Sequence, residues 1–327
     1  MPFRNPLLSK RISPAKIASN PKFPYIAALR PHQWTKNLIV FAAPLFAFSI
    51  NVQSFLGSFL AFTLFCCASS GFYLINDIAD VESDRLHPIK SSRPIAAGLV
   101  SIPVAIGMAV VLLGSALLIS WMREPALGAA VTSYAILQVA YNLRLKRTVI
   151  LDIVAIATGF VLRAFAGAAA TGIILSPWFL LCTAMLALFL GVEKRKAELR
   201  LLEIKGGKTR SVLKRYSLPL LNRMENIASN GAVLTYALWS SGPQVNGALT
   251  PWMLLTLPFV IYGIFRYQLL SDDKEIQRRK SINLEQEELS ERPDEILLKD
   301  FPIQITLVAW ILTIVSIEFL HHQNIIQ

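Results

Sequence analysis

The feature that most constrains this chain is a series of long apolar runs separated by polar loops. Hydropathy windows of about 19 residues define nine such runs. The runs cover residues 37–53, 56–76, 99–121, 125–142, 149–172, 175–192, 227–241, 251–270 and 302–320. About 20 apolar residues cross a bilayer as a helix, so the pattern predicts an all-α, polytopic integral membrane bundle of nine transmembrane helices. A 54% hydrophobic content and a mean hydropathy of +0.50 argue against an ordinary soluble domain.

The basic residues fall mainly in alternate loops. They gather in the amino-terminal tail and in the loops 77–98, 144–147, 193–225 and 271–300, whereas the opposite loops hold only Arg123 and Glu124. Positive charge is retained on the cytosolic side during insertion, so the N-terminus is predicted inside and the C-terminus outside. This places a multi-pass protein in the cell inner or plasma membrane, with a cytosolic active site. The net charge of +11 then reflects orientation and anionic ligands, and no nucleic acid is expected.

The chain divides into a tail and one domain. Residues 1–24 are basic and rich in proline, without the apolar core of a secretory signal, and are expected to form a disordered cytosolic tail. Residues 25–327 are expected to form a single membrane-embedded domain. Asp300, just before the last run, is expected to cap a helix. Disulfides and zinc are not expected, because each cysteine lies in an apolar run: Cys66, Cys67 and Cys182.

An acidic motif follows the second apolar run. Tyr73, Asn76 or Asp77, Asp80 and Asp84 recur at steps of three and four residues and therefore share one helix face. Carboxylates at this density repel one another unless a cation lies between them, and hard oxygen ligands suit Mg²⁺. The predicted metal ligands are Asn76, Asp77, Asp80 and Asp84, and the three aspartates are the predicted catalytic residues. A solvated acidic helix end is the simpler interpretation, but it does not account for the spacing.

At these residues the chain resembles the UbiA superfamily of intramembrane prenyltransferases, whose first aspartate-rich motif has the spacing NDxxDxxxD. Four further segments resemble its decaprenyl-phosphate phosphoribosyltransferase branch: LRPHQWTKN (29–37), HPIKSSRP (87–94), YNLRLK (141–146) and GFVLRA (159–164). The resemblance extends over about residues 25–320. It implies a nine-helix bundle that transfers 5-phosphoribose from phosphoribosyl pyrophosphate to a polyprenyl phosphate, with Mg²⁺ as cofactor and pyrophosphate as product.

The second aspartate motif of these prenyltransferases, DxxxD, is absent from the expected loop after the sixth run. Glu193 and Glu198 flank three cations there, Lys194, Arg195 and Lys196. Such a segment favours an anionic donor over a second magnesium cluster. Prenyl transfer from a polyprenyl diphosphate to an aromatic or other acceptor is therefore the first alternative, and a non-enzymatic membrane carrier is the second. Transporters place their polar residues near the midplane of the membrane, whereas most charges here are in loops.

Several further side chains are predicted to bind the substrates. The predicted phosphate-binding cations are Lys36, Lys90, Arg93, Lys146, Lys194 and Arg195. For each, insertion orientation or contact with lipid headgroups is the alternative role. Tyr73 is placed to reach the ribose or a phosphate. Asp152 and Arg163 lie about 16 Å apart along one predicted helix, so they are expected to face a central cavity without pairing; interhelical pairing is the alternative for both. The oligomeric state is not indicated.

Overall fold

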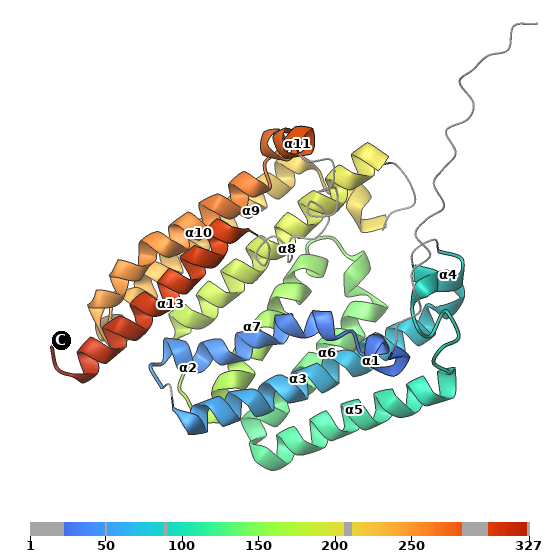
Figure 1. The fold of residues 1–327 in the computed structure, drawn as a ribbon, viewed down its shortest axis with the longest axis horizontal. Coiled ribbons are helices and arrows are strands. Elements are labelled where there is room, and N and C mark those ends of the chain that lie inside the picture. Colours follow the sequence, from blue (N-terminus) through green and yellow to red (C-terminus); the bar gives the residue numbers. More distant parts are fainter. Residues whose placement is uncertain (1–22, 50, 88–89, 206–210, 283–299, 326–327) are drawn as a thin grey trace, which may run out of the picture. The chain divides into compact units, whose positions relative to one another are not determined.

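The computed structural model describes residues 23–49, 51–87, 90–205, 211–282 and 300–325 (Figure 1). All regular structure in these ranges is helical. The first helices are α1 (Pro24–Ala28), η1 (Pro31–Phe41), α2 (Ala42–Phe46), α3 (Val52–Ala79), α4 (Val81–Arg85), η2 (Lys90–Ser92), α5 (Ile102–Arg123), α6 (Pro125–Leu143), η3 (Leu145–Arg147) and α7 (Leu151–Thr171). The later helices are α8 (Pro177–Lys205), η4 (Ser211–Arg215), α9 (Leu218–Ser240), η5 (Pro243–Val245), η6 (Pro251–Thr256), α10 (Leu257–Leu270), α11 (Asp273–Ile282) and α13 (Phe301–His322).

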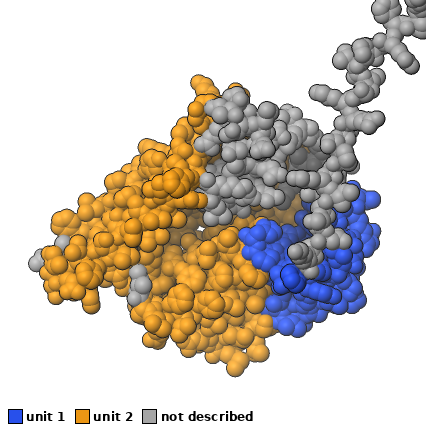
Figure 2. All heavy atoms as spheres, in the orientation of Figure 1, with its two compact units in different colours: residues 1–32, 70–112 blue, residues 33–69, 113–327 orange. Residues whose placement is uncertain are grey.

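The chain forms two compact units, which Figure 2 colours separately. Unit 1 comprises Met1–His32 and Ser70–Leu112, and unit 2 comprises Gln33–Ser69 and Leu113–Gln327. The helices α3 and α5 run from one unit into the other. The expected tail falls almost entirely outside the described residues, so it stays a prediction, as does the single domain.

Unit 1 is built around the carboxyl-terminal half of α3 and the first part of α5. Its buried core consists of Ala28, Leu74, Val81, Ile95, Val100, Ala105 and Ala109. The Ser70 hydroxyl donates a hydrogen bond of 2.9 Å to the Leu29 carbonyl, which fixes the segment after α1 against α3. This packing places the residues on either side of Leu29 close to the acidic end of α3.

Unit 2 contains the larger bundle. The helices α6, α7, α8, α9, α10 and α13 contact one another in that order (Figure 1). At Gly167 of α7 a Cβ atom would lie 2.0 Å from the Val40 carbonyl oxygen, so only glycine permits this approach. Gly172 ends α7 in the left-handed conformation, with φ of 70°, that glycine adopts without strain. These two glycines shape the packing and the end of a central helix.

Seven described helical segments are long and apolar enough to cross a membrane. They are Val52–Ala79, Ile102–Arg123, Pro125–Leu143, Leu151–Thr171, Pro177–Leu202, Pro251–Leu270 and Phe301–His322. The all-α prediction is confirmed, but the count of nine is not. The first predicted run forms the short helices η1 and α2, and α9 begins with polar residues such as Arg223 and Glu225.

The segment after the sixth apolar run is helical in its first part. Residues 193–205 continue α8, so the cations of this segment project from a regular helix. The local sequence, with Glu, Lys, Arg, Ala and Leu, is rich in strong helix formers, which accounts for the continuation.

The Asp300 prediction is confirmed, because its carboxylate accepts a hydrogen bond of 3.1 Å from the Ile303 amide at the start of α13.

Candidate active site

The acidic motif spans the junction between α3 and α4 in unit 1. α3 ends at Ala79, and Asp80 occupies the N-cap position of α4. Helical hydrogen bonding nevertheless continues, since the Asp80 amide donates to Asn76 (3.0 Å) and the Asp84 amide donates to Asp80 (2.8 Å). The predicted alignment on one helix face therefore persists through the junction. Burial separates its members: Asp77 and Asp84 are buried, Asn76 is partly buried and Asp80 is exposed.

The two buried carboxylates converge on one arginine. Arg93 Nη1 lies 2.5 Å from Asp84 Oδ2 and 3.1 Å from Asp77 Oδ1. Lys90 Nζ lies 3.9 Å from the other Asp84 oxygen. Asp77 and Asp84 thus direct oxygen atoms at a single positively charged atom. Of the residues of unit 1 that were predicted to bind metal or phosphate, the structure brings together these two aspartates, Lys90 and Arg93.

Arg30 completes this group, although the sequence analysis did not single it out. Its Nη2 lies 2.5 Å from Asp77 Oδ1, and its guanidinium carbon lies 5.0 Å from the centre of the Tyr73 ring, a cation–π distance. Arg30 has a φ of 55°, which is uncommon for a residue with a side chain. The sequence feature that could have indicated Arg30 is its position in the segment 29–37, which resembles the phosphoribosyltransferase branch and lies between α1 and η1. We call Arg30, Asp77, Asp84, Lys90 and Arg93 the aspartate cluster.

The aspartate cluster has the composition of a site for a metal-bound phosphate. Two carboxylates face three cations, and the side chains of Arg30 and Arg93 are 23% and 27% exposed, so a ligand has access to them. No set of three or more Asp, Glu, His or Cys side chains within the described ranges is arranged to hold a metal ion. Mg²⁺ commonly binds one or two carboxylates and completes its shell with water and substrate phosphates. The convergence of Asp77 and Asp84 on one cationic nitrogen fits that mode.

In unit 2, Asp152 and Arg195 bind each other. Arg195 Nε lies 2.7 Å from Asp152 Oδ2, both side chains are fully buried, and Arg195 Nη1 lies 2.5 Å from Glu198. The Tyr216 hydroxyl donates to Asp152 (2.7 Å) and accepts from the Ile150 amide (2.7 Å). Burial, reinforced by the hydrogen bond to Asp152, raises the pKa of Tyr216. We call Asp152, Arg195, Glu198 and Tyr216 the buried network. For Asp152, this network corresponds to the alternative of pairing between helices, rather than to the expected position facing a central cavity.

A second buried group lies on the same turn of α8, on a different face of the helix. Lys196 Nζ lies 2.8 Å from Glu193 and also contacts Glu225 of α9. The Gln268 amide of α10 donates to Glu225 at 2.9 Å. Glu193 and Lys196, which stand where the second aspartate motif was expected, therefore take part in contacts between α8, α9 and α10.

Arg163 is buried among neutral groups. Its guanidinium donates to Asn37 (2.6 Å), to the Gly159 carbonyl (2.8 Å) and to the Tyr134 hydroxyl (3.0 Å). No carboxylate lies within salt-bridge distance of it in the part of the chain that the structure describes. The rings of Phe65, Tyr134 and Phe160 surround its charge, with centroids 4.7 to 5.7 Å from the guanidinium carbon. As predicted, Arg163 does not pair with Asp152.

The other predicted substrate-binding lysines lie in unit 2. Lys36 of η1 donates to Gln33 at 2.7 Å. Lys146 of η3 and Lys194 of α8 are both partly buried. Their assignment to substrate binding stays a prediction.

Residues 38–284 match the model of the UbiA prenyltransferase family. A decaprenyl-phosphate phosphoribosyltransferase from Mycolicibacterium smegmatis is 39% identical over 302 residues, which cover 88% of this chain and 90% of the relative. One of the same name from Corynebacterium glutamicum is 36% identical over 318 residues, covering 95% of this chain and 90% of the relative.

The fold is similar to that of a solved UbiA homolog from Archaeoglobus fulgidus bound to DMAPP and Mg²⁺. The TM-score is 0.63 at 18% sequence identity, with 90% of this chain and 99% of the other covered. At that identity the likeness is one of fold alone. With seven apolar helices among its described residues and a family match over most of its length, the chain is an integral membrane protein and belongs to the UbiA prenyltransferase family.

Proposed function

We propose that this protein transfers 5-phosphoribose from phosphoribosyl pyrophosphate to a polyprenyl phosphate of the decaprenyl type and releases pyrophosphate. The observation that carries the proposal is the aspartate cluster, in which two buried carboxylates and three cations meet. This combination suits a metal-bound diphosphate. The names of the relatives from M. smegmatis and C. glutamicum support the choice of acceptor and of transferred group.

The reaction is a substitution at the anomeric carbon of the ribose. A lipid phosphate oxygen forms a bond to that carbon, and the bond from the carbon to the pyrophosphate oxygen breaks, with its electron pair leaving on pyrophosphate. The lipid phosphate is already an anion, so the site needs no strong general base. The main requirement is stabilisation of negative charge on the leaving group, which preorganised cations supply.

The aspartates take the metal-binding role in this proposal. Asp77 and Asp84 would hold Mg²⁺, and Asn76 and Asp80 would be the further ligands that the motif offers. Bound Mg²⁺ would neutralise charge on the departing pyrophosphate. Arg93 and Arg30 orient the two carboxylates and are exposed enough to donate to phosphate oxygens.

The remaining cations are assigned to the phosphate groups of the substrates. Lys90 joins Arg30 and Arg93 in holding the diphosphate, and Tyr73 positions the donor from the same helix stripe. Lys36, Lys146 and Lys194 bind phosphate groups. We assign Asp152 and Arg195 a supporting role, because each is fully buried and hydrogen-bonded to protein. Arg163 is kept as a substrate-binding prediction of the sequence.

We also propose the topology that the sequence predicts. Nine crossing segments, with the N-terminus in the cytosol and the C-terminus outside, put the aspartate cluster at the cytosolic edge of the inner membrane. Cysteine substitutions at exposed loop positions, labelled with an impermeant maleimide in intact cells and in inverted vesicles, test this. Labelling in intact cells of a cysteine introduced at an exposed position of α4 contradicts the orientation.

The decisive experiment is product analysis with purified protein. We expect radiolabelled phosphoribosyl pyrophosphate and polyprenyl phosphate to give a lipid-linked ribose phosphate in the presence of Mg²⁺, and none after chelation with EDTA. Mass spectrometry of the lipid identifies the product. Prenyl transfer from a polyprenyl diphosphate, with no lipid-linked ribose phosphate, would overturn the proposal in favour of the first alternative.

A further inference from the structure

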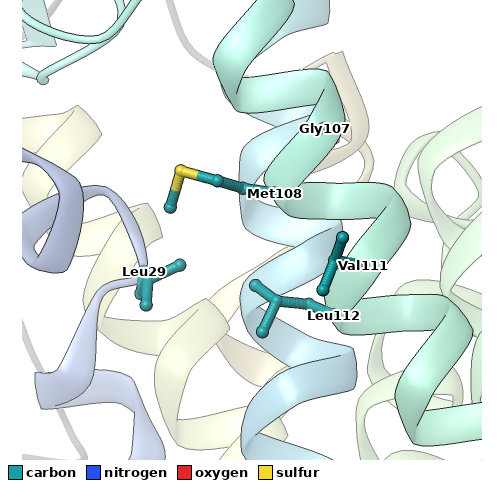
Figure 3. A pocket seen from close by; sticks show the side chains of 5 residues that line it. All are labelled: Leu29, Gly107, Met108, Val111 and Leu112. Atoms are coloured by element: carbon teal, nitrogen blue, oxygen red, sulfur yellow. The ribbon is translucent and has the colours of Figure 1, made fainter.

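An apolar groove in unit 1 is lined in part by Leu29, the residue that precedes Arg30 of the aspartate cluster. Leu29, Gly107, Met108, Val111 and Leu112 line a space of about 300 Å³. Figure 3 shows the Leu29 side chain directed across this space towards Met108 and Leu112 of α5. The volume is at the small end of the range for ligand pockets, so it accommodates part of an apolar chain.

The groove and the aspartate cluster are connected by two consecutive residues of the chain. Leu29 lines the groove, and Arg30, the next residue, binds Asp77. The hydrogen bond from Ser70 of α3 to the Leu29 carbonyl holds this junction in place. Within a single unit, consecutive residues therefore belong to a wholly apolar groove and, through the Arg30 guanidinium, to the aspartate cluster. That arrangement matches a ligand with an anionic head joined directly to an apolar tail.

The groove is also accessible from lipid. Only 17% of the apolar window of α5 is buried, so most of this helix faces outward. Val111 is 68% exposed. A Cβ added at Gly107 would meet no atom within 4 Å, so the absence of a side chain there leaves room in the groove. A branched chain needs such room for its methyl groups more than a straight acyl chain does.

We propose that this groove binds the isoprenoid segment nearest the phosphate of the polyprenyl phosphate acceptor. Arg30 and its neighbours receive the phosphate, and Leu29 with α5 receives the first isoprene units. The inference rests on the proposed function and extends it to how the acceptor is positioned. A straight acyl chain of a bilayer lipid is the competing occupant, which the experiments below separate from the isoprenoid.

The first test fills the groove by Gly107→Leu. Its matched control is Gly114→Leu on the same helix, where an added Cβ also meets nothing within 4 Å and which does not line the groove. Because buried apolar groups contribute to binding, excluding part of one isoprene unit raises the KM for a long polyprenyl phosphate about tenfold. The KM for a two-isoprene acceptor, which retains the units that occupy the groove, rises by a similar factor, and that for phosphoribosyl pyrophosphate does not change. Equal effects of the two substitutions overturn the inference.

The second test measures occupancy without turnover. A polyprenyl phosphate with a diazirine on its first isoprene unit is photolysed with the full-length protein in vesicles, and labelled peptides are mapped. We expect labels on residues 107–112, reduced at least fivefold by excess unlabelled polyprenyl phosphate and not by excess phosphatidylglycerol. Competition by phosphatidylglycerol to the same extent assigns the groove to bilayer lipid and overturns the inference.

The experiments distinguish failure of the proposed function from failure of the proposed groove. Specific labelling without phosphoribosyl transfer would retain the groove and remove the proposed function. Transfer with neither labelling of residues 107–112 nor an effect of Gly107→Leu would retain the function and remove the groove.

Discussion

The aspartate cluster of unit 1 and the buried network of unit 2 are built from the same types of side chain but differ in exposure. Asp77 and Asp84 are buried, yet Arg30 and Arg93 remain 23% and 27% exposed. In the buried network, Asp152 and Arg195 are both 0% exposed. An arginine that keeps contact with solvent can exchange a carboxylate for a ligand phosphate, whereas a fully desolvated pair cannot separate without a large penalty.

This difference in exposure indicates different roles for the two regions, ligand binding for the aspartate cluster and stabilisation of the fold for the buried network. The aspartate cluster has access to ligands and is suited to anions that arrive and leave. The buried network ties together α7, α8 and the segment that begins with η4, because Asp152, Arg195 and Tyr216 come from these three parts. Substitutions in the first region should therefore change activity, and substitutions in the second should change stability.

The largest expected effect is that of Arg195→Met. This substitution leaves Asp152 buried without its charged partner, which typically costs about 3–5 kcal/mol of folding free energy. Unfolding of the purified protein in mixed micelles, followed against SDS fraction, measures the loss. In the double variant Asp152→Leu/Arg195→Met most of the loss should be recovered, since the unpaired charge is gone. A loss below about 1 kcal/mol in the single variant means that the pair does not stabilise the fold.

Asp84→Asn tests the role of the aspartate cluster. Removing this carboxylate weakens the positioning of charge at the leaving group, and we expect kcat/KM to fall about 10²- to 10³-fold. Stability against SDS should change by less than about 1 kcal/mol. Glu82→Gln is the matched control on the same helix, because Glu82 is exposed and pairs with the half-exposed Arg85 outside the aspartate cluster, and its activity should be near that of the unmodified protein. Equal loss in both variants contradicts a specific role for Asp84.

Arg30→Met is expected to act on substrate binding. A hydrogen bond to a charged group contributes about 1.5–3 kcal/mol, so the KM for phosphoribosyl pyrophosphate should rise about ten- to a hundredfold. Initial rates at varied donor concentration measure it. Arg85→Met removes a half-exposed guanidinium from the same unit and serves as the control. If Arg30→Met lowers stability and leaves the KM unchanged, Arg30 belongs with the structural arginines.

Tyr216→Phe should have the smallest effect, a loss of about 1 kcal/mol in unfolding free energy, because one hydrogen bond to Asp152 disappears. The pKa of Tyr216 is raised, so its bond is intact below the ordinary tyrosine pKa of about 10 and weakens as the pH rises through the higher folded-state value. The stability difference between Tyr216→Phe and the unmodified protein should therefore be constant from pH 6 to 9. A difference that grows with pH in that window contradicts this assignment.

Local patterns in the sequence predicted much of the fold and part of the site. Apolar run length is a local property, and it predicted the helical membrane segments that the structure contains. The pairing of Asp77 and Asp84 with Arg93 was within reach because all three lie in one short segment. Irregular geometry could not be predicted in the same way: η1 and α2 take the place of a long first helix, although residues 37–53 form an apolar run in the sequence.

The remaining features depend on contacts between distant residues. Arg30 meets Asp77 across 47 positions, and Tyr216 meets Asp152 across 64, so no spacing in the sequence indicates either contact. Arg195 and Lys196 resembled loop cations because they stand in a run of charges after an apolar segment. Only the continuation of α8 shows that these two side chains turn inward to carboxylates on neighbouring helices.

The adjacency of Leu29 and Arg30 has a consequence for how relatives could diverge. Substitutions at Leu29 or along α5 would alter which hydrocarbon the protein accepts, while Arg30 and the aspartates stay unchanged. Acceptor choice and leaving-group chemistry would then be inherited as separate traits, although neighbouring positions in the chain encode them.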